Sequence, residues 1–259
     1  MTTDQFGVTG KIAIVTGASS GIGRVVAERF AEDGANVVVC SREQDNVDPV
    51  AEAIGENAFA VECDVTDRKA VDSLVSATIS EFGGLDVLVN NAGASFMAGF
   101  DDISPNGWRK VVDINLTGTY HCTQAAGEAL KKDSEGGRTG GSVINIASVA
   151  GQQGSPYMSH YGSAKAGVIN LTRSLAFEWA GSGVRVNCVA PGFVATEGLE
   201  SQMGISADDV KREEVERRVG LCEEIADVVQ FLASPASSYV VGETITAAGV
   251  PDIMESPEL

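Results

Sequence analysis

Short apolar segments alternate with longer amphipathic segments along most of this chain, and this alternation constrains the fold more than any other feature. Segments such as KIAIVT at 11–16 and DVLVN at 86–90 are short, apolar and rich in β-branched residues. Buried strands of a parallel sheet have this character because helices cover both faces of such a sheet. We therefore predict an α/β fold with a doubly wound parallel sheet of about seven strands.

The same pattern predicts where the elements lie. Strands are expected at residues 11–16, 36–40, 58–63, 86–90, 142–147, 184–189 and 244–247. Helices are expected at residues 21–33, 50–54, 68–82, 108–132, 159–180 and 222–232. Ser104 and Pro105 open the helix at 108–132, as a cap and a first-turn proline. Residues 192–220 carry no strand signal. No linker or change of composition divides the chain, so residues 1–259 are expected to form a single domain.

The charge balance argues against two classes of partner. The chain has 36 Asp and Glu residues against 18 Lys and Arg residues, a formal net charge of −18 at pH 7. A negative field of this size repels nucleic-acid phosphates and anionic lipid surfaces, so we expect neither as a partner. Such acidity is also typical of halophilic proteins, in which concentrated salt screens the self-repulsion. The alternative is that the acidity serves only solubility.

The cysteines show no spacing that would suggest a disulfide framework or a metal site. Cys40, Cys63, Cys122, Cys188 and Cys222 are odd in number and scattered, and the chain has only two histidines. We therefore expect buried free thiols and no metal. The first residues lack the basic start and apolar core of a signal peptide, and no apolar run is long enough to span a membrane, so we expect a cytoplasmic protein.

A glycine-rich segment, TGASSGIG at 16–23, follows the first predicted strand and opens the first predicted helix. Glycines let the backbone turn sharply and come close to a pyrophosphate. The helix N-terminus adds free N–H groups and the positive end of the helix dipole. An ordinary strand-to-helix turn is the alternative, but the strand before and the helix after favour a dinucleotide site.

Ser41 and Arg42 follow the second predicted strand, where the ribose of a bound adenosine is expected to lie. An acidic residue at this point would favour NAD, whereas a guanidinium can pair with the 2′-phosphate of NADP. We therefore predict NADP(H) in preference to NAD(H). The alternative for Arg42 is a solvated surface charge.

Tyr161 and Lys165 are four residues apart in a predicted helix and so share one face. A free phenol has a pKa near ~10, and an ammonium beside it lowers that pKa, which suits the pair to acid–base chemistry. The alternative is a surface tyrosine over a lysine side chain. Ser148 and residues 90–93 stand at the carboxyl ends of predicted strands, where open parallel sheets place ligand sites. Asn115 lies inside a predicted helix, although an amide side chain is mildly unfavourable for helix formation and no structural need for it is evident there.

Together these segments resemble the short-chain dehydrogenase/reductase family over essentially the whole chain. The matching residues are TGASSGIG at 16–23, Asp64, Val65, NNAG at 90–93, Asn115, Ser148, Tyr161, Lys165, Pro191, Gly192 and Thr196. The resemblance implies a single-domain Rossmann-type fold and an NAD(P)-dependent oxidoreductase that acts on CH–OH groups. It also implies a substrate-covering lid near residues 194–220 and a homo-oligomer, either a tetramer or a dimer.

The resemblance further implies a role for each site residue. Tyr161 would donate a proton to the carbonyl oxygen during reduction, and Ser148 would orient that oxygen. Lys165 would hold the nicotinamide ribose and lower the pKa of the tyrosine, and Asn115 would position a water that links Lys165 to solvent. The implied cofactor-binding residues are Gly17, Ser19, Ser20, Gly21, Ile22, Gly23, Ser41, Arg42, Asp64, Val65, Asn91, Ala92, Gly93, Tyr161, Lys165, Pro191, Gly192, Val194 and Thr196.

Within the family, the chain looks most like 3-oxoacyl-[acyl-carrier-protein] and 3-oxoacyl-CoA reductases. A broad carbonyl, sugar or steroid-type alcohol dehydrogenase is the alternative, and a nucleotide-binding protein without catalysis is a more remote one. The net charge and the apolar Phe177 weaken the case for docking of an acidic carrier protein. A group of apolar residues either lines the substrate pocket or packs the lid: Phe96, Met97, Tyr157, Met158, Leu199, Met203 and Ile205.

Overall fold

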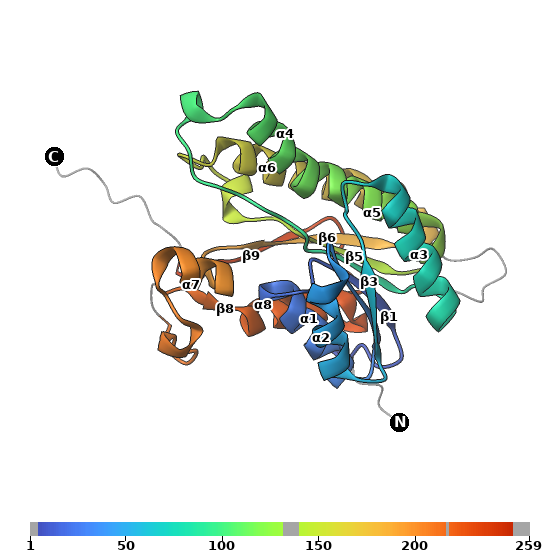
Figure 1. Cartoon of the computed structure of the whole chain (residues 1–259). Coiled ribbons are helices and arrows are strands. Elements are labelled where there is room, and N and C mark those ends of the chain that lie inside the picture. The colour runs from blue at the N-terminus through green and yellow to red at the C-terminus, as the bar shows by residue number, and fades with distance from the viewer. Residues whose placement is uncertain (1–4, 132–139, 216–217, 251–259) are drawn as a thin grey trace.

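A computed structural model describes residues 5–131, 140–215 and 218–250, and for residues 202 and 203 the backbone alone. Its central sheet has seven parallel strands in the order β3-β2-β1-β4-β5-β6-β9 (Figure 1). The strands are β1 Ile12–Thr16, β2 Asn36–Ser41, β3 Ala58–Glu62, β4 Val87–Asn90, β5 Ser142–Ile146, β6 Arg185–Pro191 and β9 Thr244–Ala247. The strand order reverses between β1 and β4, which is where open sheets of this kind bind ligands.

Helices cover both faces of the sheet, as predicted (Figure 1). One face is covered by α1, α2 and α8, and the other by α3, α4, α5 and α6. The helices are α1 Gly21–Glu32, α2 Gln44–Ile54, α3 Arg68–Phe82, α4 Pro105–Val112, α5 Gly118–Leu130, α6 Ser159–Trp179, α7 Glu197–Met203 and α8 Cys222–Ala233.

The apolar strands supply a core on each side of the sheet. Ile14 and Val38 belong to the core beneath α3, α5 and α6, whereas their neighbours Val15 and Val39 belong to the core beneath α1, α2 and α8. All four are fully buried because successive strand residues point to opposite faces and both faces are covered. This explains why the strands appear in the sequence as continuous apolar runs.

Most predicted bounds differ from the structure by two residues or fewer, and the larger differences concern the second helix, the segment at 192–220 and the helix at 108–132. The second helix begins at Gln44 and not at Val50, because buried Val47 packs its first turn against the core in spite of Pro49. The segment without a strand signal contains the two-residue strands β7, Val194–Ala195, and β8, Gly220–Leu221, which pair with each other. Strands this short leave no periodic pattern in the sequence.

The helix predicted at 108–132 is also not one regular rod. Its start is as predicted: Pro105 stands in the first turn, and the hydroxyl of the capping Ser104 accepts a hydrogen bond from the Gly107 N–H at 3.0 Å. One π-helical turn, Asp113–Thr117, then separates α4 from α5. Lys132, the predicted end, lies outside the described residues. Such π turns are rare and occur often at functional sites.

All five cysteines are buried and free. Within residues 5–131, 140–215 and 218–250, no group of three or more His, Cys, Asp or Glu side chains is placed to hold a metal ion. Among the same residues, none of the helices is long and apolar enough to cross a lipid bilayer.

Candidate active site

The glycine segment after β1 packs directly against the end of β4. Gly17 has a φ of +63°, and a Cβ atom there would lie 2.8 Å from the Cα atom of Ala92. A Cβ atom on Gly23 would lie 2.4 Å from both the Gly17 carbonyl oxygen and the Asn91 amide nitrogen. Side chains at either position would push the loop away from the strand ends. The two glycines therefore let the backbone lie open at the switch point of the sheet.

Asn91 and Thr16 hold this loop in place. The Asn91 side-chain amide donates hydrogen bonds to the carbonyl oxygens of Thr16 and Gly17, each at 3.0 Å. The Thr16 hydroxyl accepts from the backbone N–H groups of Asn91 and Ala92, also at 3.0 Å each. Asn91 was predicted as a cofactor-binding residue, and its side chain here serves the shape of the loop. Thr16 was not predicted to act at the site.

The N-terminus of α1 holds an anion that the chain itself provides. The Gly21 N–H donates to Oε2 of Glu197 at 3.0 Å, and Oε1 of the same carboxylate lies 3.3 Å from a guanidinium nitrogen of Arg24. The first turn of α1 contains no acidic residue, and Ser20 makes no side-chain cap. A carboxylate at this point is stabilised by the free N–H groups and the helix dipole.

Arg42 and Asp64 lie at the carboxyl ends of β2 and β3. Arg42 is exposed, and no hydrogen bond or ion pair to its side chain is present among the described residues. Asp64, expected to bind the cofactor, accepts hydrogen bonds from the N–H and hydroxyl of Thr66 at 2.9 and 2.8 Å through a single oxygen, Oδ1. Val65 beside it is buried, and Ser41 donates to the Glu43 carbonyl.

Tyr161 lies near the start of α6, and Ser148 follows β5. The hydroxyl of Ser148 lies close enough to the Tyr161 phenol to lower the phenol pKa, but burial has the larger effect and raises that pKa. Ser148 also accepts a hydrogen bond from the Ala150 N–H at 3.2 Å. The two predicted hydroxyl groups are therefore neighbours at the carboxyl end of β5.

Lys165 is buried one turn further along α6. Its ammonium donates to the Ile146 carbonyl oxygen at 2.7 Å and lies 5.6 Å from the Tyr161 ring centre. Burial lowers the pKa of Lys165 to about 8, and a nearby Cys188 thiol works in the opposite direction. Burial raises the pKa of Tyr161 here and the Lys165 ammonium donates to a backbone carbonyl, so a lowering of the tyrosine pKa by Lys165 stays a prediction.

Asn115 lies in the π turn, which aims its amide at the same point. The amide nitrogen donates to the carbonyl oxygens of Ala94 and Val111 at 2.7 and 2.9 Å. The amide oxygen is buried and has no hydrogen-bond partner among the described residues. A Cβ atom on Gly93 would lie 2.8 Å from that oxygen and 3.5 Å from the Lys165 ammonium. The oxygen is thus free to accept a hydrogen bond from a water.

A chain of buried amides and hydroxyls lies beneath the site. Asn90 donates to the Thr123 hydroxyl at 2.9 Å and to the Asn145 amide oxygen at 2.8 Å. Asn145 in turn donates to the Thr172 hydroxyl at 2.9 Å. These bonds tie β4 and β5 to α5 and α6. In the sequence, asparagines at the ends of apolar strands are the feature that indicates these hydrogen bonds. The prediction used this feature only at residues 90–93.

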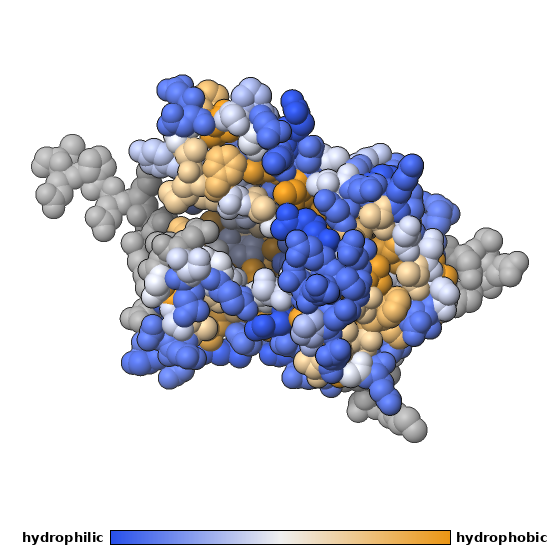
Figure 2. Space-filling model, viewed as in Figure 1, coloured by the Kyte–Doolittle hydropathy of each residue, from blue (hydrophilic) through white to orange (hydrophobic). Residues whose placement is uncertain are grey.

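Apolar side chains gather at one edge of the site. Figure 2, viewed as in Figure 1, shows a hollow between the α4 side and the α7 side of the molecule. Phe96, Met97 and Tyr157 are 42%, 71% and 64% exposed. Tyr157 has a φ of +64°, the only positive φ outside glycine in the described residues, and its carbonyl accepts from the Ala98 N–H at 2.9 Å. Strained residues of this kind occur often at ligand sites.

The segment predicted to be a lid begins after β6 and returns to the chain's core at α8. Buried Pro191 ends β6, and a Cβ atom on Gly192 would meet the Ala248 Cβ at 2.9 Å. Val194 belongs to β7, and Thr196 caps α7 by accepting from the Leu199 N–H at 3.2 Å. The polar half of this segment is exposed, including Asp208, Asp209 and Glu213. Glu216, another acidic residue of the segment, lies outside the described residues.

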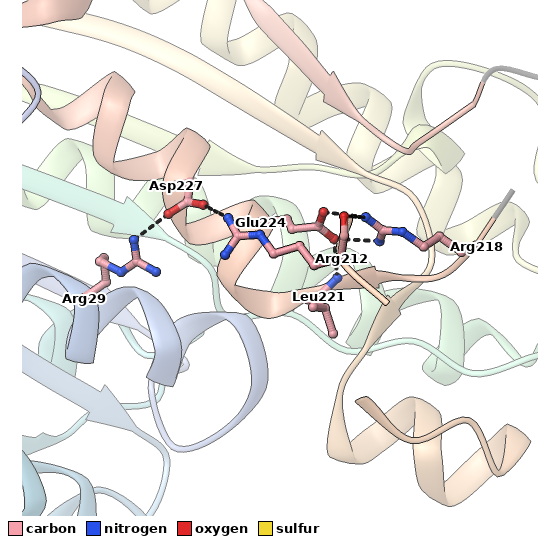
Figure 3. Close-up of polar contacts among 6 residues, drawn as sticks. All are labelled: Arg29, Arg212, Arg218, Leu221, Glu224 and Asp227. Atoms are coloured by element: carbon pink, nitrogen blue, oxygen red, sulfur yellow. Dashed lines mark hydrogen bonds and ion pairs between the residues drawn. The ribbon is translucent and has the colours of Figure 1, made fainter. Parts of the chain in front are cut away.

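Ion pairs connect the segment before α8, which contains Arg212 and Arg218, to side chains of α8 (Figure 3). Arg218 donates two hydrogen bonds to Glu224, at 2.7 and 2.8 Å, and Glu224 also accepts from the Leu221 N–H at 2.9 Å. The Arg218 hydrogen bonds lower the pKa of Glu224 to about 2. Asp227 bridges Arg212 of the lid and Arg29 of α1. Neither arrangement was predicted from the sequence.

Comparison with known proteins agrees with this arrangement. Residues 17–249 match the family described as enoyl-(acyl carrier protein) reductase. The chain is 40% identical to a 3-oxoacyl-[acyl-carrier-protein] reductase of Synechocystis sp., over 93% of this chain and 97% of the relative. It is 41% identical to a cis-4-hydroxycyclohexanecarboxylate dehydrogenase of Sinomonas cyclohexanicum, over 92% and 95%.

A solved structure supports the same conclusion. A short-chain type dehydrogenase/reductase from Mycobacterium marinum superposes with a TM-score of 0.86 at 36% identity, covering 95% of this chain and 97% of that one. The relatives are named reductases and dehydrogenases, so this chain is an oxidoreductase that acts on CH–OH groups. Sequence, fold and relatives together show that the chain belongs to the short-chain dehydrogenase/reductase family.

Proposed function

We propose that this protein is an NADP(H)-dependent oxidoreductase that interconverts a ketone and a secondary alcohol, with a 3-oxoacyl thioester as its substrate. One observation carries the proposal. Tyr161, Ser148 and Lys165 meet at the carboxyl end of β5, beside the unpartnered amide oxygen of Asn115. A hydroxyl pair, an ammonium and a free amide oxygen at one point are the parts that proton transfer to a carbonyl needs.

The residues around the glycine segment fit a dinucleotide. Gly17 and Gly23 let the loop backbone approach the strand ends closely, and the α1 N-terminus already binds a carboxylate through the Gly21 N–H. A phosphate would find the same N–H groups and helix dipole there. When bound, the nicotinamide group supplies or accepts the hydride at the carbonyl carbon.

The chain's own residues then handle the carbonyl oxygen and its proton. During reduction, the Tyr161 phenol donates its proton to the carbonyl oxygen, and the Ser148 hydroxyl orients that oxygen. The raised pKa of Tyr161 keeps the phenol protonated, as an acid must be before it reacts. Lys165, with a pKa of about 8, exchanges protons near neutral pH, and Asn115 holds the water that connects it to solvent. Oxidation runs the same proton path in reverse.

Arg42 supports the choice of NADP. Its guanidinium lies at the end of β2, is exposed and has no partner among the described residues, so it is free to pair with a 2′-phosphate. Carboxylates are present nearby, but Glu43 accepts from the Asn46 side chain and Glu62 from the Gln44 N–H. An unpaired cation at this point favours a phosphate over a hydroxyl.

The named relatives and the apolar edge support a 3-oxoacyl thioester. The Synechocystis relative acts on such a compound by its name. Phe96, Met97 and Tyr157 offer an apolar surface to an acyl chain. Phe177 is 88% exposed on α6, where docking of an acidic carrier protein would need a basic side chain; coenzyme A, although also anionic, needs no such protein-docking patch, which favours it. A cyclic alcohol is the second candidate, because the Sinomonas relative is named for one.

The test is a substrate panel with both cofactors. Initial rates with a 3-oxoacyl-CoA, a 3-oxoacyl carrier protein and 4-oxocyclohexanecarboxylate are measured with NADPH and with NADH. The proposal predicts the highest kcat/KM for the 3-oxoacyl-CoA with NADPH. A preference for the cyclic ketone supports the second candidate, and no turnover of any ketone contradicts both.

A matched pair of variants tests the cofactor. Arg42→Ala should raise the KM for NADPH far more than the KM for NADH. Arg173→Ala, which removes an exposed arginine of α6, should change neither. Equal effects of Arg42→Ala on the two cofactors would contradict the 2′-phosphate role.

A further inference from the structure

Glu197 occupies a position that an enzyme of this kind would be expected to leave open. Its carboxylate accepts a hydrogen bond from the Gly21 N–H at 3.0 Å and lies 3.3 Å from a guanidinium nitrogen of Arg24. It thus occupies the anion-binding position at the start of α1, here called the anion seat. The two residues are 176 positions apart in the chain. We propose that Glu197 is an affinity-determining residue that competes with the pyrophosphate of the cofactor for this seat.

The competition follows from the geometry of the seat. The Gly21 N–H can face only one anion closely, and two negative groups within hydrogen-bond distance of it would repel each other. A Cβ atom on Gly21 would lie 3.2 Å from the Thr196 methyl and 3.7 Å from the Glu197 carboxylate, so α7 approaches the seat closely. A phosphate therefore enters only when the Glu197 carboxylate withdraws.

Withdrawal is feasible because Glu197 is held from one side only. Its side chain is 53% exposed, and it stands in the first turn of α7, at the start of the lid. Arg24 keeps a second carboxylate partner in Glu28, at 3.6 Å, when Glu197 leaves. Because Thr196 and Glu197 are adjacent, the exchange also moves the residue that caps α7. Binding of the cofactor is thereby coupled to the position of the lid.

The inference rests on the proposed cofactor, and one variant tests it. Glu197→Gln keeps an oxygen that can accept from Gly21 but removes the negative charge. We expect it to bind NADPH at least about threefold more tightly than the unaltered chain does. The phosphate then no longer has to displace a carboxylate that the helix terminus and Arg24 stabilise. The affinity is measured by fluorescence titration of the full chain, without substrate and without turnover.

A second readout separates competition from a structural role. Without cofactor, Glu197→Gln should lower the Tm by roughly 2 °C, because the α1 terminus and Arg24 lose their charged partner. Weaker apo stability together with tighter NADPH binding is the signature of competition. A residue with a purely structural role would weaken both.

Two controls show whether the effect is local. Glu200→Gln removes the same charge from the same helix, and the Glu200 side chain is exposed with no contact to the glycine segment among the described residues. It should leave NADPH affinity unchanged. Adenosine 2′-monophosphate, which lacks the pyrophosphate, should bind the unaltered chain and Glu197→Gln equally.

Each contrary result has a distinct meaning. Equal or weaker NADPH binding by Glu197→Gln overturns the role of Glu197. Equal tightening in Glu200→Gln, or equal tightening for adenosine 2′-monophosphate, attributes the effect to net charge and overturns it as well. If the unaltered chain binds neither NADPH nor NADH, the proposed function itself fails, and the competition fails with it.

Discussion

At the scale of single residues, Tyr157 shows how conformational strain can mark a site. Its φ of +64° is unfavourable for any residue with a Cβ atom, yet most of its ring is exposed and gains little from packing. Burial therefore does not account for a tyrosine at this position. Contact of the ring with an apolar substrate would account for it.

Tyr157→Gly should therefore stabilise the protein and impair substrate binding. Glycine adopts this φ without strain, so the free energy of unfolding should rise by about 1 kcal/mol. The KM for a long-chain 3-oxoacyl substrate should rise, while the KM for a small ketone stays the same. Thermal unfolding and steady-state kinetics measure the two effects. Tyr157→Asn, which tolerates the same φ without an aromatic ring, should repeat the kinetic result, and an unchanged long-chain KM in both would contradict the substrate contact.

At the scale of elements, the strand and helix pattern was largely predictable. β-branched apolar runs predicted the seven strands, and the bounds of α3 were predicted to the residue. The rest depends on contacts between distant parts of the chain. α2 begins before its predicted first residue because buried Val47 packs against the core, and β7 is too short to show the alternation of apolar and polar residues that marks a strand. Glu197 meets Gly21 only after folding, so no local pattern announces that contact.

The site could be predicted only in part, because some of its contacts are local in the sequence and others form only in the folded chain. Tyr161 and Lys165 are neighbours on one helix, so their spacing alone brings them together. The direction of the Tyr161 pKa shift was not predictable, because burial and the Ile146 carbonyl bound to Lys165 belong to the tertiary structure. Asn115 was noticed as an unfavourable helix residue, and the π turn is the structural reason for it.

The element that returns the lid to α8 should respond to acid. Arg218 holds the pKa of Glu224 at about 2, against an ordinary value of 4.5. A lowered folded-state pKa stabilises the protein above the ordinary value, and this contribution is lost as the pH falls from about 4.5 towards 2. Glu224→Gln should therefore cost roughly 2 kcal/mol at neutral pH and progressively less below pH ~4.

Urea unfolding across this pH range measures the loss. The control is Glu223→Gln, since no hydrogen bond to the neighbouring Glu223 side chain is present among the described residues. That variant should change stability little at any pH. If the deficit of Glu224→Gln is the same at neutral and acid pH, the ion pair with Arg218 is not its cause.

At the scale of the whole molecule, the net charge of −18 predicts a response to salt. Exposed acids on α7 and the lid repel one another, and raising KCl shortens the Debye length from about 8 Å at physiological ionic strength to about 3 Å at 1 M. The Tm should therefore rise with KCl more than it does with sucrose, which does not screen charge. A Tm independent of KCl would contradict adaptation to concentrated salt and leave the acidity as a solubility feature.

The central claim is that Tyr161 gives the proton to the carbonyl oxygen, and Tyr161→Phe tests it most directly. The variant keeps the ring in place and removes only the hydroxyl. Ketone reduction, followed by the loss of NADPH absorbance, should fall by about 10²-fold or more. NADPH affinity, measured by fluorescence titration, should stay nearly intact, because the variant loses only one hydroxyl among the many groups expected to bind the cofactor. A variant that retains its turnover would contradict the account, because the proton would then come from another group.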